Sequence, residues 1–349
     1  MSIQARKCSE LSALSLEPSA DARIEATILE IQRMSTEDGP GIRTTVFFKG
    51  CPLKCLWCHN PESIPPHPQI HWIENQCIGC KTCLGVCPEG ALTFTESGNH
   101  IDRHRCNGCG LCVEECPGAA LELLGRRWGV DDLVAEVTKD RTYFETSAGG
   151  VTLGGGEPTL QGAFVLALLT SLKRIGIHTA LDTCGLCSWN VLERLLPNVD
   201  LLLFDLKEMD PQKHRGFTGS TNEQIRENLI RVGEQMASEG HPGQLWIRTP
   251  IIPDATATRE NIRAIGMFIA EHLKGRVDRW ELCAFNNLCR DKYSRLDLDW
   301  AYGEKELLRR LVMEKMATVA RHSGVDPEIV LWSGSTKLEA DIIGPGENI

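Results

Sequence analysis

Apolar and polar positions follow two alternating patterns from about residue 128 to the end of the chain. Short β-branched or apolar runs predict strands at residues 150–153, 178–182, 200–206, 244–249 and 279–285. Segments with helical periodicity accompany them at residues 131–144, 164–174, 189–196, 222–236, 259–273 and 304–321. A last apolar piece covers residues 329–332. Strands that alternate with helices in this way predict a parallel sheet covered by helices.

An earlier strand at residues 43–49 (RTTVFFK) brings the number of strand–helix units to six. Six units predict an α/β fold, a partial TIM-like (β/α)6 barrel. Barrels of this kind carry their chemistry on the loops that follow the carboxyl ends of the strands.

The barrel pattern is interrupted between its first and second strands. We expect a flexible N-terminal tail at residues 1–25, a barrel formed by residues 26–66 and 124–349, and an insert at residues 67–123. The insert holds cysteine-rich runs and two short strand-like pieces, residues 91–95 and 119–123.

Charge and composition remove several classes of function. The chain has 349 residues and a net charge of −10, so it lacks the basic surface that broad nucleic-acid binding needs. No apolar run approaches the roughly 18 residues of a membrane span. Glutamates and serines interrupt residues 1–23, which argues against a signal peptide. We therefore expect a cytoplasmic protein whose partners include neither nucleic acid nor membrane.

Cysteine is the anomaly, with 16 residues in a chain long enough to bury its own core without disulfides. Eleven lie between residues 51 and 116, at spacings that point to metal ligands. We expect the other five to be mostly buried small apolar side chains, with a metal pair at Cys184 and Cys187 as the weaker alternative. These five are Cys8, Cys184, Cys187, Cys283 and Cys289.

Two of the cysteine groups form an internal repeat, 29 residues apart, and each ends in Cys-Pro. The spacing is that of bacterial ferredoxins with [4Fe–4S] clusters, in which the fourth cysteine crosses to the other cluster. One predicted cluster therefore has the ligands Cys77, Cys80, Cys83 and Cys116. The other has the ligands Cys87, Cys106, Cys109 and Cys112. Zinc is the alternative, because CxxC pairs also suit tetrahedral thiolate sites.

The remaining group, Cys51-x3-Cys55-x2-Cys58, has no fourth cysteine nearby. Three protein ligands leave one metal position open, as in sites that bind substrate. The stretch GCPLKCLWCHNP closely resembles the radical S-adenosylmethionine (SAM) motif. The resemblance implies a third, catalytic [4Fe–4S] cluster on these cysteines, beside Trp57 and His59, with SAM chelating the open iron. One electron then cleaves the sulfonium to methionine and a 5′-deoxyadenosyl radical.

Other candidate residues follow the later strands. The turn GGGEP at residues 154–158 lacks the Gly-Lys-Ser/Thr and GxGxxG patterns of phosphate loops. The resemblance to radical SAM enzymes assigns contact with the methionyl amino group of SAM to Gly155, Gly156 and Glu157. An isolated carboxylate at a strand end is more often a helix cap, but several polar residues here would share one rim with SAM. These further candidates are Asp182, Thr183, Asp205, Leu206, Lys207 and Arg248. Asp182 and Asp205 also form a candidate site for a monovalent cation.

Together with residues 35–44 (STEDGPGIRT), VTLGGGEP, DTCG and FDLKEMD, the motifs resemble the activating enzymes of glycyl radical enzymes, the family of the pyruvate formate-lyase activase. The resemblance runs from about residue 27 over nearly the whole chain. It implies that the adenosyl radical abstracts a hydrogen from a backbone glycine of a large partner, a glycyl radical enzyme. It also implies an electron donor of low potential, such as flavodoxin or ferredoxin, in an anaerobic cytoplasm.

The chain departs from many relatives after its sixth strand, where Asn286 and Asp291 stand at positions that often carry histidine. This departure favours a partner from the fumarate-adding, benzylsuccinate-like branch. One alternative function is a radical SAM enzyme that acts on a small molecule. Another is a polyferredoxin-like electron carrier, which would leave the three-cysteine motif and the barrel without a role.

Overall fold

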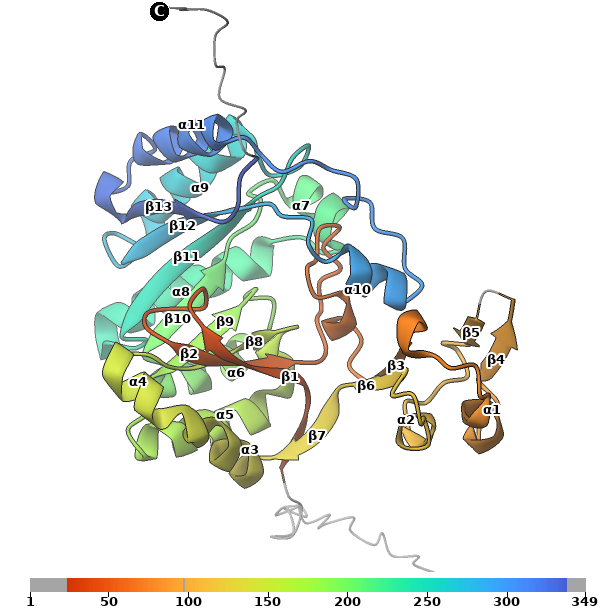
Figure 1. The fold of residues 1–349 in the computed structure, drawn as a ribbon. Coiled ribbons are helices and arrows are strands. Elements are labelled where there is room, and N and C mark those ends of the chain that lie inside the picture. Colours follow the sequence, from red (N-terminus) through yellow and green to blue (C-terminus); the bar gives the residue numbers. More distant parts are fainter. Residues whose placement is uncertain (1–23, 97, 338–349) are drawn as a thin grey trace, which may run out of the picture.

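The computed structural model describes residues 24–96 and 98–337, so the predicted tail lies outside it except for its last two residues. One curved sheet forms the body, in the order β13-β12-β11-β10-β9-β8-β2-β1-β7 (Figure 1). All neighbouring strands from β2 to β13 are parallel. They are β2 (Arg43–Phe48), β8 (Gly150–Gly155), β9 (Thr179–Thr183), β10 (Leu201–Asp205), β11 (Gln244–Ile251), β12 (Arg279–Ala284) and β13 (Val330–Ser333).

The partial barrel predicted from the strand–helix alternation is therefore confirmed, and the apolar piece at 329–332 adds β13 as a further parallel strand. The sequence pattern missed β1 (Glu25–Ser35) and β7 (Arg126–Gly129), which extend the sheet on the β2 side in antiparallel pairing. Charged and amide side chains such as Glu30, Gln32 and Arg33 interrupt the apolar positions of β1, which explains the omission.

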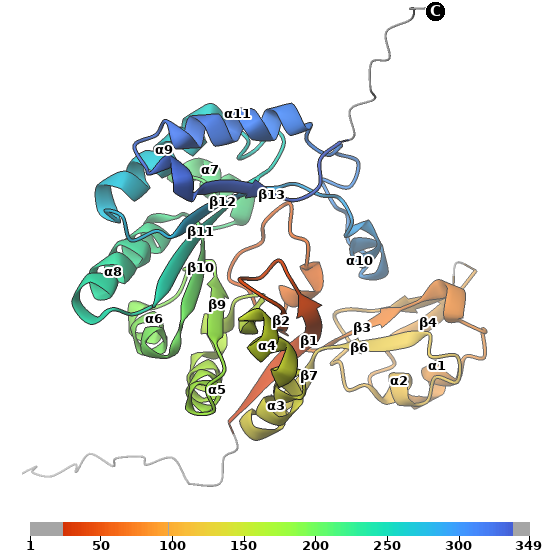
Figure 2. The same ribbon diagram turned by 60° about the vertical axis from the view of Figure 1, so that its left-hand side comes forward.

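Helices cover the outer face of the sheet (Figures 1 and 2). They are α3 (Val130–Val137), α4 (Arg141–Ser147), α5 (Gly162–Arg174), α6 (Trp189–Leu195), α8 (Glu223–Glu239), α9 (Arg259–His272) and α11 (Arg310–Arg321). Two further helices lie off this face: the end of α7 (Pro211–Thr218) contacts the loop after β2, and α10 (Arg290–Arg295) lies between the barrel and the insert. Short 3-10 helices supplement them: η1 (Pro61–Ser63), η2 (Glu74–Gln76), η3 (Thr138–Asp140), η4 (Pro158–Gln161), η5 (Leu196–Asn198) and η6 (Pro327–Ile329). Within the described range, no helix combines the length and apolar character of a membrane span.

Two expected helices are shorter than the pattern indicated. The helix at 131–144 is broken by η3, where the carboxylate of Asp140 accepts hydrogen bonds from Arg33 and from the Thr44 hydroxyl. The helix at 304–321 begins only at Arg310, because the preceding Leu308 and Arg309 pair with Lys337. Helices α7 and α10 were not predicted.

Strand alternation separates the core from the barrel interior. Along β11, Leu245, Ile247 and Ile251 are fully buried in the large apolar cluster that includes the covering helices. The intervening Arg248 lines the cavity at the carboxyl end of the barrel instead. The same alternation brings polar side chains from neighbouring strands to one rim. In the strand register, for example, Asp205 of β10 lies opposite Arg248 of β11.

The insert forms a separate lobe beside the barrel (Figure 2). Strands β3 (Gln69–Trp72) and β6 (Leu121–Leu124) pair antiparallel at its base, and β4 (Leu92–Thr95) pairs with β5 (Gly98–Ile101). Two one-turn helices, α1 (Thr82–Val86) and α2 (Leu111–Glu114), carry cysteines. A small apolar core holds the lobe together: Ile70, Leu92, Ile101, Cys112 and Leu121.

Candidate active site

A cavity of about 270 Å³ opens at the carboxyl ends of the parallel strands. Most of the candidate catalytic and SAM-binding residues line it, although they come from the loop after β2 and from four further strands. Those residues are Cys51, Cys55, Trp57, Cys58, His59, Gly155, Gly156, Asp182, Thr183, Asp205, Lys207 and Arg248. Glu157 and Leu206 do not line the cavity; both are buried behind its wall.

Backbone hydrogen bonds hold the three-cysteine loop in place. The amide of Cys51 donates to the carbonyl of Ile64 at 3.1 Å, and the amide of Cys58 donates to the carbonyl of Cys55 at 3.0 Å. The amides of Lys54 and Leu56 donate to the end of α7, at 2.8 and 3.0 Å. The loop is therefore shaped by the protein, with its three thiols beside one cavity.

Aromatic packing supports the same loop. Trp57 is buried, and its ring centroid lies 6.0 Å from that of Phe217 and 6.3 Å from that of Tyr302. The neighbouring His59 interacts through Nε2 with the carbonyl of Asn286 at 3.0 Å. Burial lowers the pKa of His59, which favours the neutral ring near neutral pH.

Glycine at positions 155 and 156 is explained by contacts within the protein, which the sequence did not reveal. A Cβ on Gly156 would lie 2.3 Å from the carbonyl oxygen of Gly50, and a Cβ on Gly155 would lie 2.7 Å from Phe47 Cα. Gly155 also has φ +103°, which favours glycine. Glycine is thus required here by the close approach of Gly155 to β2 and of Gly156 to the start of the three-cysteine loop, in addition to any contact with a ligand in the cavity.

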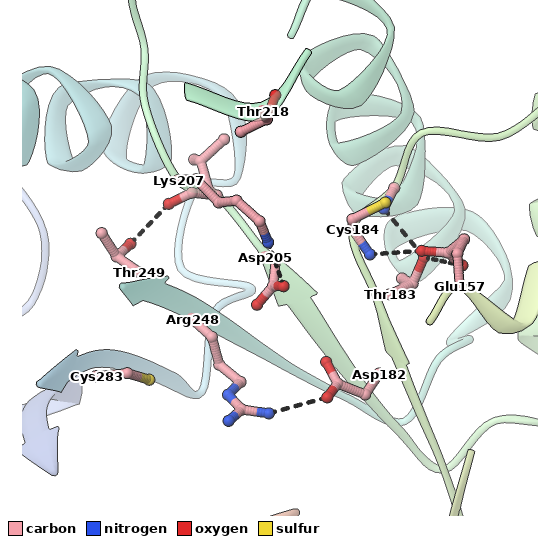
Figure 3. A network of polar contacts seen from close by, with 12 residues as sticks. Glu157, Asp182, Thr183, Cys184, Asp205, Lys207, Thr218, Arg248, Thr249 and Cys283 are labelled. Carbon is pink, nitrogen blue, oxygen red and sulfur yellow. Dashed lines mark hydrogen bonds and ion pairs between the residues drawn. The ribbon is translucent and has the colours of Figure 1, made fainter. Parts of the chain in front are cut away.

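Glu157 is engaged entirely within the protein. Its fully buried carboxylate accepts four hydrogen bonds: from the amide and hydroxyl of Thr159, from the Thr183 hydroxyl, and from the Cys184 amide (Figure 3). The SAM contact expected of Glu157 stays a prediction, and these bonds give its side chain a positioning role within the protein. Glu157 joins the segment after β8 to the end of β9, where Asp182 and Thr183 line the cavity.

Two ion pairs lie across the cavity rim. Arg248 Nη1 donates to Asp182 Oδ2 at 3.0 Å, and Lys207 Nζ donates to Asp205 Oδ2 (Figure 3). Burial raises the pKa of Asp182 to about 7, although the charge of Arg248 acts in the opposite direction. Burial disfavours the charged Lys207, but nearby negative charge, that of Asp205 foremost, together with the Asp205 hydrogen bond outweighs burial and raises the Lys207 pKa above its ordinary value. The rim presents two cations and two carboxylates within reach of one ligand.

Two cysteines outside the predicted ligand set also line the cavity. Cys184 follows β9, and its thiol lowers the pKa of the Cys51 thiol. Cys283 lies near the end of β12, where burial raises its pKa to about 11. Both were expected to be buried apolar residues. The sequence feature that could have identified them as cavity residues is their position at or just after the end of a strand, which also identified Asp182 and Arg248.

The eight insert cysteines fall into the two groups that the crossing rule predicts. One pocket is lined by Cys77, Cys80, Cys83 and Cys116. The other is lined by Cys87, Cys106, Cys109 and Cys112. Among the described residues, no three His, Cys, Asp or Glu side chains are arranged around a single metal ion.

The sequence repeat is also a repeat of backbone geometry. Gly79 and its counterpart Gly108 both have φ +69°. The amide of Ala91 donates to the sulfur of Cys87 at 3.3 Å, and the amide of Ala120 donates to that of Cys116 at 3.3 Å. The two sites are therefore built alike. Hydrogen bonds of this kind, when made to a sulfur that binds a cluster, are one means by which proteins set the cluster's potential.

Comparison with family models gives three matches. The 4Fe-4S dicluster domain matches residues 76–122, the radical SAM superfamily matches residues 103–260, and the 4Fe-4S single cluster domain matches residues 37–96. The dicluster match decides between iron–sulfur clusters and zinc for the insert.

Three curated relatives align over most of their own lengths. The (2S)-3-sulfopropanediol dehydratase activating enzyme of Klebsiella oxytoca is 36% identical over 84% of this chain and 93% of the relative. The trans-4-hydroxy-L-proline dehydratase activating enzyme of Clostridioides difficile is 39% identical over 84% and 94%. The isethionate sulfite-lyase activating enzyme of Oleidesulfovibrio alaskensis is 38% identical over 88% and 98%.

Among solved structures, a domain of pyruvate-formate lyase-activating enzyme from Bacteroides vulgatus is similar at 28% identity with a TM-score of 0.43. It covers 53% of this chain and 99% of that one.

Proposed function

Because the chain belongs to the activating enzymes of glycyl radical enzymes, within the radical SAM superfamily, we propose that its barrel cavity is where SAM is cleaved and where the partner's glycine is presented. The observation that carries this proposal is the convergence of Cys51, Cys55 and Cys58 on the cavity rimmed by Asp182, Asp205, Lys207 and Arg248. Iron–sulfur clusters and SAM are the cofactors of the family.

The residues present fit a catalytic cluster that has one open iron. Three cysteines of a preformed loop would hold it, as three protein ligands with one position left for SAM. When bound, the cluster and SAM supply one-electron cleavage of the sulfonium and a 5′-deoxyadenosyl radical that takes a hydrogen atom from glycine. With the two insert quartets, we propose three [4Fe–4S] clusters, or about 12 irons per chain.

The chain's own residues supply binding and positioning rather than acid–base chemistry. Lys207 and Arg248 can pair with a carboxylate of the ligand, while Asp182 and Asp205 favour its amino group and its sulfonium. Glu157 fixes the strand end that carries Asp182 and Thr183. The apolar wall formed by Trp57, Ile252 and Phe285 limits the access of water to the reacting groups.

We also propose that Asp182 and Asp205 hold a monovalent cation when SAM is bound. Each carboxylate has a cationic side chain as its partner, and a metal cation would take the place of these side chains. SAM affinity measured in potassium or sodium chloride, against choline chloride at equal ionic strength, tests this. A difference that vanishes in Asp182→Asn supports the cation.

The partner is a glycyl radical enzyme, and its identity is a narrower proposal. Relatives of this chain are named for dehydratases and for a sulfite-lyase, so these classes are the first to test. The Asn286 and Asp291 departure leaves the fumarate-adding branch as the second candidate. A low-potential donor such as flavodoxin or ferredoxin in an anaerobic cytoplasm completes the proposal, since exposed clusters are sensitive to oxygen.

The experiment is anaerobic incubation of the reconstituted enzyme with SAM, dithionite and each candidate partner. A doublet radical signal on the partner, with one 5′-deoxyadenosine formed per radical, supports activation. SAM cleavage without a partner radical, accompanied by a modified metabolite, would favour the small-molecule alternative. The Cys51/Cys55/Cys58→Ala variant should lose about four irons and all SAM cleavage.

A further inference from the structure

The segment at residues 286–300, called here the bridging segment, contacts the back of the cluster loop at several points. Tyr293 Oη donates to the carbonyl of Cys58 at 2.9 Å, and Trp300 Nε1 donates to the carbonyl of Leu56 at 3.1 Å. The two aromatic rings stack with centroids 5.0 Å apart and planes 13° apart. The bridging segment therefore holds both sides of Trp57, in the middle of the three-cysteine loop.

Helix α10, within this segment, also holds the exit of the loop. Lys292 Nζ donates to Asn60 Oδ1 at 2.8 Å and to Glu62 Oε1 at 2.6 Å. Glu62 is buried, and its other carboxylate oxygen has no hydrogen-bond partner. The ion pair with Lys292 therefore offsets much of the free-energy cost of burying this carboxylate. From Glu62 the chain continues into the insert, whose first strand begins at Gln69.

The insert also contacts the bridging segment, through Arg103. Arg103 lies in the insert, where Nη1 donates to the carbonyl of Ile70 in β3. Its Nη2 reaches across to the carbonyl of Arg295, at 3.2 Å, and to the carboxylate of Asp297, at 3.3 Å. One guanidinium thus joins a strand of the insert to the end of α10, two residues beyond Tyr293. Figure 1 shows α10 between the barrel and the insert.

We propose that the bridging segment couples the insert to the catalytic cluster, with Tyr293 as the positioning residue that acts on the cluster loop and Arg103 as the contact that transmits the insert's position. This rests on the proposed assignment of Cys51, Cys55 and Cys58 as ligands of the catalytic cluster. The Tyr293 hydroxyl points its proton at the carbonyl of a ligand residue. Its dipole stabilises added negative charge and orients the peptide that follows Cys58, both of which affect a cluster's potential.

The coupling has a consequence for the activating reaction. On this proposal, a displacement of Arg103 by a partner or an electron donor docked on the insert would reach, through α10, the loop proposed to hold the catalytic cluster. The insert thereby controls how readily the catalytic cluster is reduced, by a mechanical route that needs no transfer of electrons between clusters.

Redox titration of the SAM-sensitive cluster signal in the anaerobic holoenzyme tests the proposal. Tyr293→Phe should keep the full iron content but lower the potential by the equivalent of about a tenfold change in the reduction equilibrium, about 59 mV for one electron. Tyr143→Phe, on the half-exposed Tyr143 of α4, is the matched control and should leave the potential unchanged. An unchanged potential in Tyr293→Phe, with iron intact, would overturn the positioning role.

Arg103→Met should shift the same potential in the same direction, whereas Arg105→Met should not, because Arg105 bonds Glu89 within the insert. In a double-mutant cycle, Arg103→Met should have a smaller effect in the Tyr293→Phe background than in the wild type. Equal effects in the two backgrounds, or none, would overturn the coupling. Failure of the ligand assignment is distinguishable, because the Cys51/Cys55/Cys58→Ala variant would then retain its iron.

Discussion

The carboxylate of Glu157 and the hydroxyl of Thr183 are joined by a 2.8 Å hydrogen bond between the segment after β8 and the end of β9. The second carboxylate oxygen of Glu157 accepts the amide of Cys184 at 2.8 Å. Both wall segments of the cavity are therefore held at a fixed separation by one buried side chain. From this geometry we expect the loss of Glu157 to affect folding as well as SAM binding.

Glu157→Gln should lower the free energy of unfolding by about 2–3 kcal/mol, because the new NH2 group faces buried donors in place of an acceptor. Chemical denaturation under anaerobic conditions measures this loss, and SAM binding should weaken in parallel. If unfolding were unchanged while SAM cleavage was lost, Glu157 would contact the ligand directly and the positioning role would be wrong.

Gly156→Ala should destabilise the protein by about 1–3 kcal/mol and reduce iron incorporation at the catalytic loop, because its Cβ would meet the Gly50 carbonyl at 2.3 Å. Gly216→Ala in α7 is the matched control, since an added Cβ there meets nothing within 4 Å. That change should leave the iron content unaltered and stabilise α7 by about 0.5–1 kcal/mol. Full iron content in Gly156→Ala would refute the steric argument.

Cys184→Ala should retain about 12 irons per chain and the ability to bind SAM. Cys184 lines the same cavity as Cys51, yet the proposal leaves the fourth position of the catalytic cluster to SAM. Iron analysis and the response of the cluster signal to SAM measure both properties. A loss of about four irons would instead identify Cys184 as a fourth protein ligand.

The pH dependence of stability should include a contribution from His178. Burial lowers its pKa, as does the nearby charge of Arg43, whose Nη2 lies 3.4 Å from His178 Nδ1. The unfolded chain then binds a proton that the folded chain resists, so this contribution is complete above about pH 6.5 and is lost as pH falls below it. His178→Gln should show a shallower fall in unfolding free energy from pH 7.5 to 5.5 than the wild type. An equal fall in both proteins would contradict the assignment.

The strands and the cluster cysteines could be predicted because each depends on a local pattern. The apolar runs of β8 to β12 report burial directly, and the cysteine spacing in the insert encodes which sulfurs share a cavity. Strand β1 was missed because its polar residues interrupt the apolar alternation that identified the central strands.

The roles of Glu157, Cys184 and the bridging segment could not be predicted, because they depend on contacts between distant parts of the chain. The hydrogen bond from Tyr293 to the carbonyl of Cys58 spans 235 residues of sequence, and no periodicity reports it. The same holds for the glycine turn, where the sequence indicated close approach but not that the approaching group is the protein's own backbone.

Electron–nuclear double resonance on the reduced, anaerobic holoenzyme with SAM labelled at its amino nitrogen and carboxylate oxygen is the most direct measurement. The account predicts hyperfine coupling from both labels to a cluster iron, and its disappearance when Cys51, Cys55 and Cys58 are replaced by alanine. Absence of coupling in wild-type enzyme with its full iron content would mean that every cluster iron is already closed by the polypeptide, and the account would be contradicted.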